Sequence, residues 1–190
     1  MADDTTSQEA MTEDATDEAV EEMPVRELPE NPILSGLAEL FTAVEFTSFE
    51  PIAGPRQDTA TVSRDELLAF VQAVKDAGFE TFIDLCAVDH LNRVPRYDVV
   101  INVLSMERAQ RLIIKVGIPG DEPTVASITS VYTGANFYER EAWDLFGIAF
   151  EGHTDLTRIL LPDEWEGHPL RKNYSVGAVP VQFKDSYKAP

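Results

Sequence analysis

The sequence predicts an α+β fold, in which a small and mostly antiparallel sheet packs with helices and an extended C-terminal docking arm follows. One observation is the expected order of elements: two strands, a helix, three strands and a second helix. Another is that Ile148 to Pro190 has four prolines and no sustained periodicity. We therefore expect an acidic disordered leader at 1–31, an α+β core domain at 32–150 and an extended interface arm at 151–190.

The leader is defined by its composition. Residues 1–31 contain eleven acidic residues against Arg26 alone, and no aromatic residue. Such a segment buries too little apolar surface to offset the entropy lost on ordering. The whole chain carries a formal charge of −19, which disfavours nucleic acid and anionic lipid as partners, because both require clustered Lys and Arg.

The core domain is expected to begin with a helix and two short strands. Asn31 suits an N-cap and Pro32 the first helical position, which predicts a helix to about Phe41. Alternating residues predict strands at 44–49 and 59–62, joined by a proline-bounded turn at 51–55.

The next helix has the clearest signals. The run from Ser63 to Glu66 is typical of a capping box, in which the serine hydroxyl and the glutamate each bind a free backbone amide. Gly78 supplies a C-terminal stop. Between them, four apolar residues recur at helical spacing on one face: Leu67, Phe70, Val71 and Val74.

Three strands are expected to form an antiparallel meander. β-branched and aromatic residues cluster at 79–88, 96–106 and 111–116, with turns at 92–95 and 106–110. After the break at 117–120, Pro123 is expected to open a short helical segment. Asn136 and Glu139 then predict a second capping box, for a helix from about Phe137 to Phe146 that ends at Gly147.

This last helix contains a dense group of charges. Arg140, Glu141 and Asp144 are expected on one face, and apolar side chains on the opposite face. An enzyme would use two of the carboxylates as acid and base, which needs a cleft and one raised pKa. We favour a structural role in which the charged face pairs with a basic partner, because Arg140 holds its neighbours ionised.

The other reactive residue types do not form a recognisable site in the sequence. His153 and His168 lack zinc-ligand spacing, and His90 is interpreted as a turn residue. Cys86, the single cysteine, is expected to be a buried structural thiol and cannot alone hold an iron–sulfur cluster. We find no dinucleotide loop, P-loop, nucleophile elbow, signal peptide or apolar run long enough to cross a membrane.

The arm interleaves aromatic, apolar and basic residues. Trp, Tyr and Arg commonly anchor protein interfaces, because they combine a large apolar area with planar hydrogen bonding. We therefore interpret the segment as a docking arm, and the alternative is an ordinary tail that folds on its own domain. The residues concerned are Arg158, Trp165, His168, Arg171, Lys172 and Tyr174.

Together these residues resemble a known family. The runs 139–148, Gly152-His153, 158–161 and 165–172 are similar to the signature of the 30 kDa (C) subunit of respiratory complex I, the NADH-quinone oxidoreductase. The chain departs from that pattern at Thr154, where the family usually has proline, and at 173–175, where it usually has Asp-Tyr-Pro. The leader and the last residues have no counterpart.

The resemblance implies a cofactor-free scaffold subunit in the peripheral arm of a proton-translocating complex, on the cytoplasmic face of the cell membrane. FMN, the iron–sulfur clusters and quinone would be held by partner subunits. The partners would be the 49 kDa (D) subunit and the subunit that carries the terminal iron–sulfur cluster, and membrane contact would be made only through the complex. The expected interface residues are Glu139, Arg140, Glu141, Asp144, His153, Arg158, Trp165, His168, Arg171, Lys172 and Tyr174.

Two alternatives stay open. The first is the equivalent subunit of a membrane-bound hydrogenase or a deazaflavin-dependent dehydrogenase, which copurifying partners would distinguish. The second is a free-standing hydrolase that uses Glu139, Glu141 and His153. For the favoured interpretation, we expect Arg140→Ala and Arg171→Ala to weaken assembly rather than a chemical step.

Overall fold

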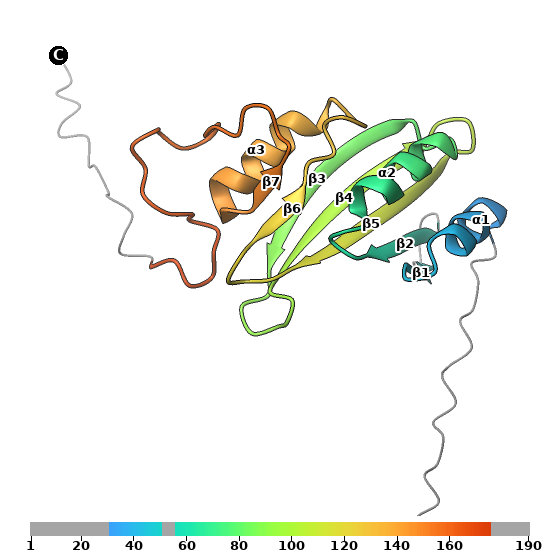
Figure 1. Ribbon diagram of the computed structural model, residues 1–190, viewed down its shortest axis with the longest axis horizontal. Helices are drawn as coiled ribbons and strands as arrows, with labels where there is room; N and C mark the ends of the chain where they lie inside the picture. The colour runs from blue at the N-terminus through green and yellow to red at the C-terminus, as the bar shows by residue number, and fades with distance from the viewer. Residues whose placement is uncertain (1–30, 51–55, 176–190) are drawn as a thin grey trace, which may run out of the picture.

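Five strands form the sheet that organises the chain, in the order β1-β2-β5-β4-β3 (Figure 1). The computed structural model describes residues 31–50 and 56–175. Its elements are α1 (Pro32–Leu40), β1 (Glu45–Phe49), β2 (Gln57–Val62), α2 (Leu67–Asp76), β3 (Thr81–Asp89), β4 (Tyr97–Ser105), β5 (Gln110–Ile118), β6 (Thr124–Ala126), α3 (Ala135–Phe146) and β7 (Ala149–Glu151).

The sheet is mixed but mostly antiparallel. β3, β4 and β5 form the predicted meander, in which Ile101 lies opposite both Leu85 and Ile114. β1 is antiparallel to β2, and only the β2–β5 pair is parallel. The α+β class and the mostly antiparallel sheet are therefore confirmed.

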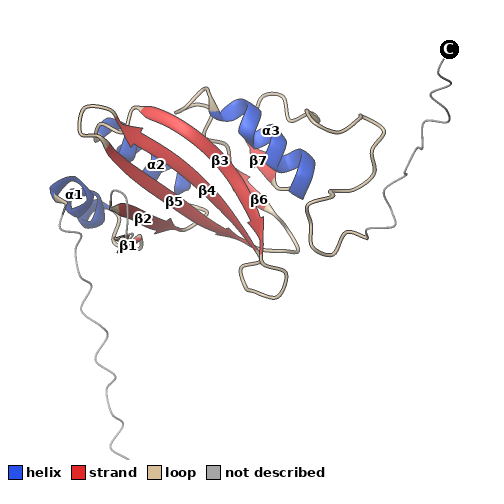
Figure 2. Ribbon diagram, turned by 180° about the vertical axis from the view of Figure 1, so that it is seen from behind, coloured by secondary structure: helices blue, strands red, loops and turns tan. Residues whose placement is uncertain are grey.

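One face of this sheet builds the core. Along β4 the burial alternates strictly, and Val99, Ile101 and Val103 are fully buried. Their face packs against α2, whose predicted apolar side chains, Phe70 and Val74 among them, are also fully buried. In the opposite view α2 lies behind the sheet (Figure 2), so the outward positions of the strands form a second, more exposed face.

The predicted helix ends are confirmed more often than the predicted starts. Asn31 caps α1 by accepting a hydrogen bond from the amide of Ile33 at 3.0 Å. α2 stops before Gly78, whose φ of +98° lies in the left-handed region that favours glycine.

Both predicted capping boxes are wrong. The hydroxyl of Ser63 donates to the carboxylate of Glu66 at 2.8 Å instead of accepting from a backbone amide, and α2 begins only at Leu67. α3 begins at Ala135, one residue before Asn136, without a side-chain cap. The side chain of Glu139 instead binds Ser127 and Ile128, which precede α3 in the chain.

Two short segments also differ from prediction. The residues after Pro123 form the strand β6 rather than a helical segment, and β6 pairs in parallel with β7, which lies across the predicted boundary at residue 150. Burial of Val125 and Phe150 accounts for this pairing. Cys86 lies in β3 as expected, but its side chain is exposed because it points away from the core.

Several expectations concern residues outside the described part of the chain. They are residues 1–30 of the disordered leader predicted at 1–31, the turn at 51–55 and the last fifteen residues of the arm, 176–190. Among the described residues, none of the helices is both long enough and apolar enough to cross a bilayer.

Candidate subunit interface

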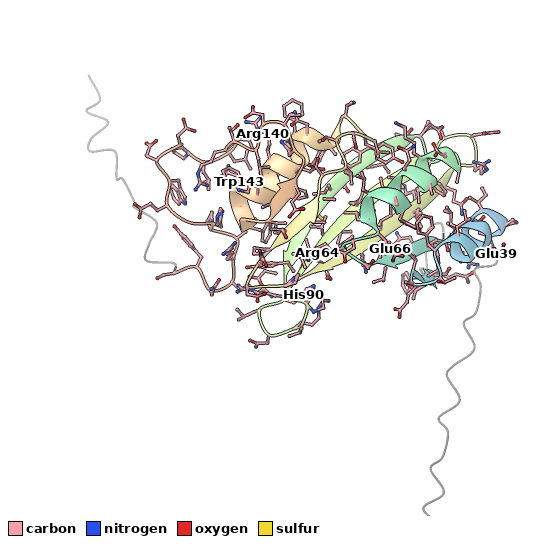
Figure 3. All side chains as sticks on the ribbon, viewed as in Figure 1. Glu39, Arg64, Glu66, His90, Arg140 and Trp143 are labelled. Carbon is pink, nitrogen blue, oxygen red and sulfur yellow. The ribbon has the colours of Figure 1, made fainter. Side chains whose placement is uncertain are left out.

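The helix α3 carries four of the predicted interface residues, Glu139, Arg140, Glu141 and Asp144, and the others follow it in the chain. It ends at Gly147, whose φ of +71° allows the left-handed turn that closes the helix. Arg140 and Trp143 extend from α3 toward the loop that follows β7 (Figure 3). We call this loop, residues 152–175, the arm segment.

Asp144 organises the first half of the arm segment. Its carboxylate accepts a hydrogen bond from Nη1 of Arg158 at 2.5 Å. It also accepts from three successive amides, those of Ile159, Leu160 and Leu161, at 3.1, 2.9 and 3.0 Å. Asp144 is fully buried because the chain's own later residues cover it, and the basic group with which it pairs is Arg158 of the same chain.

Arg158 extends the same network. Its Nη2 atom donates to the carbonyls of Trp165 at 2.7 Å and Gly167 at 3.3 Å. The guanidinium also lies 5.7 Å from the centre of the Trp143 ring, within the range of a cation–π interaction. Arg158 thus fixes both ends of a loop of about ten residues.

His168 and Arg171 bind the open carbonyls at the end of α3. Nδ1 of His168 lies 2.9 Å from the carbonyl oxygen of Asp144, and Arg171 donates to the carbonyls of Phe146 and Gly147. Arg171 suits this position, since the last carbonyls of a helix have no partner within it and favour a positive charge. Burial lowers the pKa of His168, so its ring serves here as a hydrogen-bond partner rather than as a cation. The side chains of His168 and Arg171 are both half-buried against their own chain.

Arg140 holds the start of the arm segment. Its guanidinium donates to the carbonyl and hydroxyl oxygens of Thr157 at 3.1 and 3.0 Å, and to the carbonyl of Arg158 at 3.0 Å. His153 lies nearby, with Nε2 3.3 Å from the carbonyl of Asn136. Both residues therefore bind backbone of their own chain.

A second carboxylate, Asp89, holds the far end of the arm segment. It forms a two-point ion pair with Arg96 at 2.9 and 2.7 Å and accepts from the amide of Lys172 at 2.8 Å. Arg96 also donates to the side chain of Asn173 at 2.8 Å. Asp89 was not expected from the sequence, in which its only signal is a carboxylate at the end of an apolar strand.

These contacts set the protonation of both aspartates. The hydrogen bonds from Arg96 hold the pKa of Asp89 far below its usual range, against the opposing effect of burial. For Asp144, burial by itself would raise the pKa. The hydrogen bonds from the Leu161 and Leu160 amides and from Arg158 outweigh it and lower the pKa. Both groups are therefore anions that anchor the arm segment.

The predicted carboxylates of an enzymatic site are not brought together. Glu139 is fully buried and accepts from the Ser127 hydroxyl at 2.7 Å and the Ile128 amide at 2.8 Å, whereas Glu141 is exposed. Burial raises the pKa of Glu139, although its hydrogen bonds oppose this. In the described ranges, no three His, Cys, Asp or Glu side chains gather as metal ligands.

The outer side of the arm segment is apolar in part. The amides of 159–161 turn inward to Asp144, and Leu160 remains 59% exposed and Leu170 51% exposed. Lys172 is exposed, whereas Trp165 and Tyr174 are half-buried, and the Tyr174 hydroxyl donates to the carbonyl of Glu166 at 3.2 Å. The alternative interpretation, an ordinary tail that folds on its own domain, therefore describes part of the arrangement, because the arm segment packs on the domain that precedes it.

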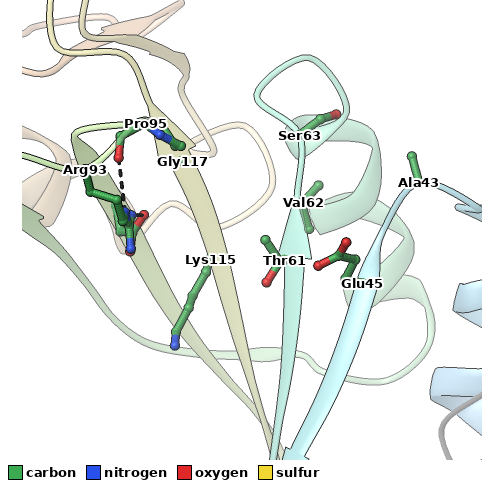
Figure 4. A pocket seen from close by; sticks show the side chains of 10 residues that line it. Ala43, Glu45, Thr61, Val62, Ser63, Arg93, Pro95, Lys115 and Gly117 are labelled. Carbon is green, nitrogen blue, oxygen red and sulfur yellow. Dashed lines mark hydrogen bonds and ion pairs between the residues drawn. The ribbon is translucent and has the colours of Figure 1, made fainter. Parts of the chain in front are cut away.

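A separate hollow of about 500 Å³ lies near the β3–β4 turn (Figure 4). Its wall includes Arg93, which is paired with Asp98, and Lys115 and Glu45, which face it from β5 and β1. Acidic and basic groups alternate in this wall, so it does not select an ion of one sign.

The chain matches known proteins over most of the described residues. A family model described as "Respiratory-chain NADH dehydrogenase, 30 Kd subunit" matches residues 60–179. The NADH-quinone oxidoreductase C-subunit of Roseiflexus sp. (strain RS-1) is 43% identical over 118 residues, which are 62% of this chain and 68% of that protein. The C-subunit of Sinorhizobium medicae (strain WSM419) is 45% identical over 134 residues, 68% of this chain and 66% of that protein.

Other relatives agree. The C-subunit of Roseiflexus castenholzii is 50% identical over 100 residues, 53% of this chain and 58% of that protein. The matches thus span between 58% and 68% of these three relatives' lengths.

Two solved structures are similar in fold. A trypsin-resistant fragment of Nqo5 superposes with a TM-score of 0.56 at 28% identity, covering 65% of this chain and 99% of the fragment. A chain of the membrane-bound sulfane sulfur reductase, an archaeal respiratory membrane complex, gives a TM-score of 0.67 at 23% identity, covering 77% of this chain and 85% of that chain. At that identity the second similarity concerns the fold alone.

Proposed function

The chain belongs to the family of the 30 kDa subunit of respiratory-chain NADH dehydrogenase, and we propose that it acts as a cofactor-free scaffold subunit in the peripheral arm of a proton-translocating NADH:quinone oxidoreductase. It helps to position the iron–sulfur and quinone-site subunits while electrons pass from NADH to quinone through those partners. The observation that carries the proposal is the anchoring of the arm segment by Asp144 and Asp89.

The geometry supports a scaffold rather than a catalyst. Every charged group that anchors the arm segment is satisfied by groups of the same chain, and the carboxylates are held as anions instead of being tuned for proton transfer. Contacts of this kind, made by arginine side chains and backbone groups, hold the surface of the arm segment in one conformation. The exposed apolar residues of that surface, Leu160 and Leu170, are then available to a partner.

The proposed partners are the 49 kDa (D) subunit and the subunit that carries the terminal iron–sulfur cluster. FMN, the clusters and quinone belong to partner subunits, and contact with the cytoplasmic face of the membrane is made through the complex. In the proposed interface, Glu141, Lys172 and the outer atoms of Trp165 and Tyr174 face the partner. Glu139 and Asp144, which are fully buried, instead support the surface from inside.

A second candidate is the equivalent subunit of a related membrane complex, such as a membrane-bound hydrogenase. A chain in the archaeal sulfane sulfur reductase shares the fold, which is compatible with this class but does not distinguish it from the first candidate. The relatives named as C-subunits of NADH-quinone oxidoreductases are 43–50% identical, which favours the first candidate.

Copurification distinguishes the two candidates. The chain is tagged at its C-terminus, native membranes are extracted in mild detergent, and the recovered proteins are identified while NADH-to-quinone activity is assayed. We expect flavin, iron–sulfur and membrane subunits together with the activity. Hydrogenase subunits without a flavin subunit would support the second candidate, and recovery of the chain alone would contradict both.

The arm segment can be tested in the same preparation. Arg140→Ala and Arg171→Ala should lower the amount of assembled complex, because each removes hydrogen bonds that hold the arm segment. Arg111→Ala is a matched control, since Arg111 is exposed at the far end of the sheet. Normal amounts of complex with slow turnover would contradict the scaffold role.

A further inference from the structure

A small hollow lies at the free edge of the sheet, between β3 and α3. Its volume is about 160 Å³, and its wall is mostly apolar. The residues that line it are Leu85, Cys86, Ala87, Glu141, Ala142, Leu145, Phe146 and Leu170. An apolar cavity of about 150 Å³ is large enough to hold a benzene molecule, so this hollow fits one leucine-sized or phenylalanine-sized side chain.

The rim of the hollow is apolar on one side and acidic on the other. Leu170, which lines the hollow, is 51% exposed, and Val88, two residues after Cys86 in β3, is 39% exposed. Glu141 is exposed, and within the described residues its side chain forms neither a hydrogen bond nor an ion pair. The hollow therefore has an unpaired carboxylate at its edge.

Carboxylates lie beside the hollow on β3 and α3, whereas Arg171 lies at its other end and donates to the carbonyl of Phe146. Partial burial raises the pKa of the Cys86 thiol, and the nearby carboxylates of Asp84 and Glu141 raise it further. Asp84 accepts a hydrogen bond from the neutral side chain of Asn102 at 2.5 Å. A neighbouring group that complements this edge is a cation.

From this geometry we propose that the hollow receives one apolar side chain of a partner subunit, and that a lysine or arginine next to that side chain pairs with Glu141. The inference rests on the proposed function and adds the chemistry of the contact. Leu170 links the hollow to the arm segment, because its amide donates to the carbonyl of Leu145 at 3.1 Å. Apolar anchors that fill pockets beside a charge pair are typical of interface hot spots.

Cys86 gives a direct test, because it is the only cysteine of the chain and lines the hollow. N-ethylmaleimide is added to the isolated full chain and to the assembled complex in native membranes, and the Cys86 adduct is quantified by mass spectrometry. We expect labelling of the isolated chain and loss of labelling in the complex. Equal labelling of an assembled complex overturns the inference and leaves the proposed function intact, whereas a chain that never copurifies with partners defeats both.

Labelling of the isolated chain also tests two other possible occupants of the hollow. If removal of residues 176–190 increases Cys86 labelling, the hollow is filled by the chain's own C-terminus. If labelling falls as protein concentration rises, it is filled by a second copy. Either result overturns the inference.

Charge reversal tests the acidic rim. Glu141→Lys should lower recovery of the complex about tenfold, since a desolvated ion pair becomes a repulsion. Glu107→Lys is the matched control, because Glu107 is also an exposed acid and lies in the β4–β5 turn, away from the hollow. Unchanged recovery of the complex with Glu141→Lys overturns the proposed pairing of Glu141 with a basic side chain of the partner. Circular dichroism of the isolated variants verifies that both fold.

Discussion

Asp144 and Arg158 form an ion pair of 2.5 Å that joins the last turn of α3 to the arm segment. The aspartate side chain is fully buried and the arginine side chain is 13% exposed. Three backbone amides share the same carboxylate. A single buried charge thus determines the path of four consecutive residues.

Replacing this charge should release the arm segment. Asp144→Asn should destabilise the docked state by about 3–5 kcal/mol, because Arg158 stays buried without its counter-charge. Hydrogen exchange at the amides of 159–161 should become fast, while exchange in β4 and β5 stays slow. Asp155→Asn is the control, since Asp155 is exposed in the same segment. Slow exchange in the Asp144→Asn variant would show that the carboxylate does not hold the arm segment.

Acid should release the arm segment in the unmodified protein. The pKa values of Asp89 and Asp144 lie below the ordinary value in the folded chain. Their stabilising contribution is therefore present above about pH 4 and is lost as the pH falls through the folded-state values. Limited proteolysis of the arm segment against pH measures the loss, and Asp89→Asn should flatten the dependence. If proteolysis of the Asp89→Asn variant depends on pH as it does in the unmodified chain, Asp89 does not cause the acid release of the arm segment.

Two glycines provide a matched test of close packing. Gly147 and Gly152 both have positive φ, +71° and +85°, so alanine at either position costs about 1 kcal/mol of backbone strain. A Cβ atom at Gly147 would also clash with Arg171 and His168, whereas a Cβ at Gly152 has no neighbour within 4 Å. We expect Gly147→Ala to lower the melting temperature clearly more than Gly152→Ala. Equal decreases in melting temperature would mean that backbone strain alone, and not the clash at residue 147, destabilises the variants.

The buried carboxyl of Glu139 should make stability fall as pH rises. Burial raises its pKa in the folded chain, so ionisation destabilises the fold between the unfolded-state pKa and the raised one. Glu139→Gln should remove this dependence and retain one acceptor for the Ile128 amide. Glu139→Ala should cost about 1–3 kcal/mol, since Ser127 and Ile128 lose their partner. Urea unfolding between pH 5 and pH 8 measures both effects.

Deleting residues 2–30 should leave the fold intact. The leader's acidic composition gives it few apolar groups to bury. The melting temperature of the deletion variant should match that of the full chain. A large decrease would contradict the prediction.

The sequence predicted the elements whose signals are local. The apolar face of α2 with its stop at Gly78, and the cluster of β-branched and aromatic residues that forms β4, each lie within a few neighbouring residues and so were recognisable. β6 and β7 were missed because each has only three residues, too few for a period. Ser63 and Glu66 fitted a capping pattern, but their side chains bind each other.

The candidate site was predicted by residue type rather than by arrangement. Helical spacing placed Asp144 on a charged face, but spacing cannot indicate that residues 157–161 later cover that face. Asp89 was missed because its contact with Lys172 joins residues 83 positions apart, which no local pattern reports.

That same separation has a consequence for biogenesis. During synthesis the β3–β5 meander can form from contacts close in sequence, which fold early. The clamp between Asp89 and Lys172 closes only after residue 172 has left the ribosome. The proposed contact surface is therefore completed last, and a nascent chain with a finished sheet still lacks the surface that a partner would recognise.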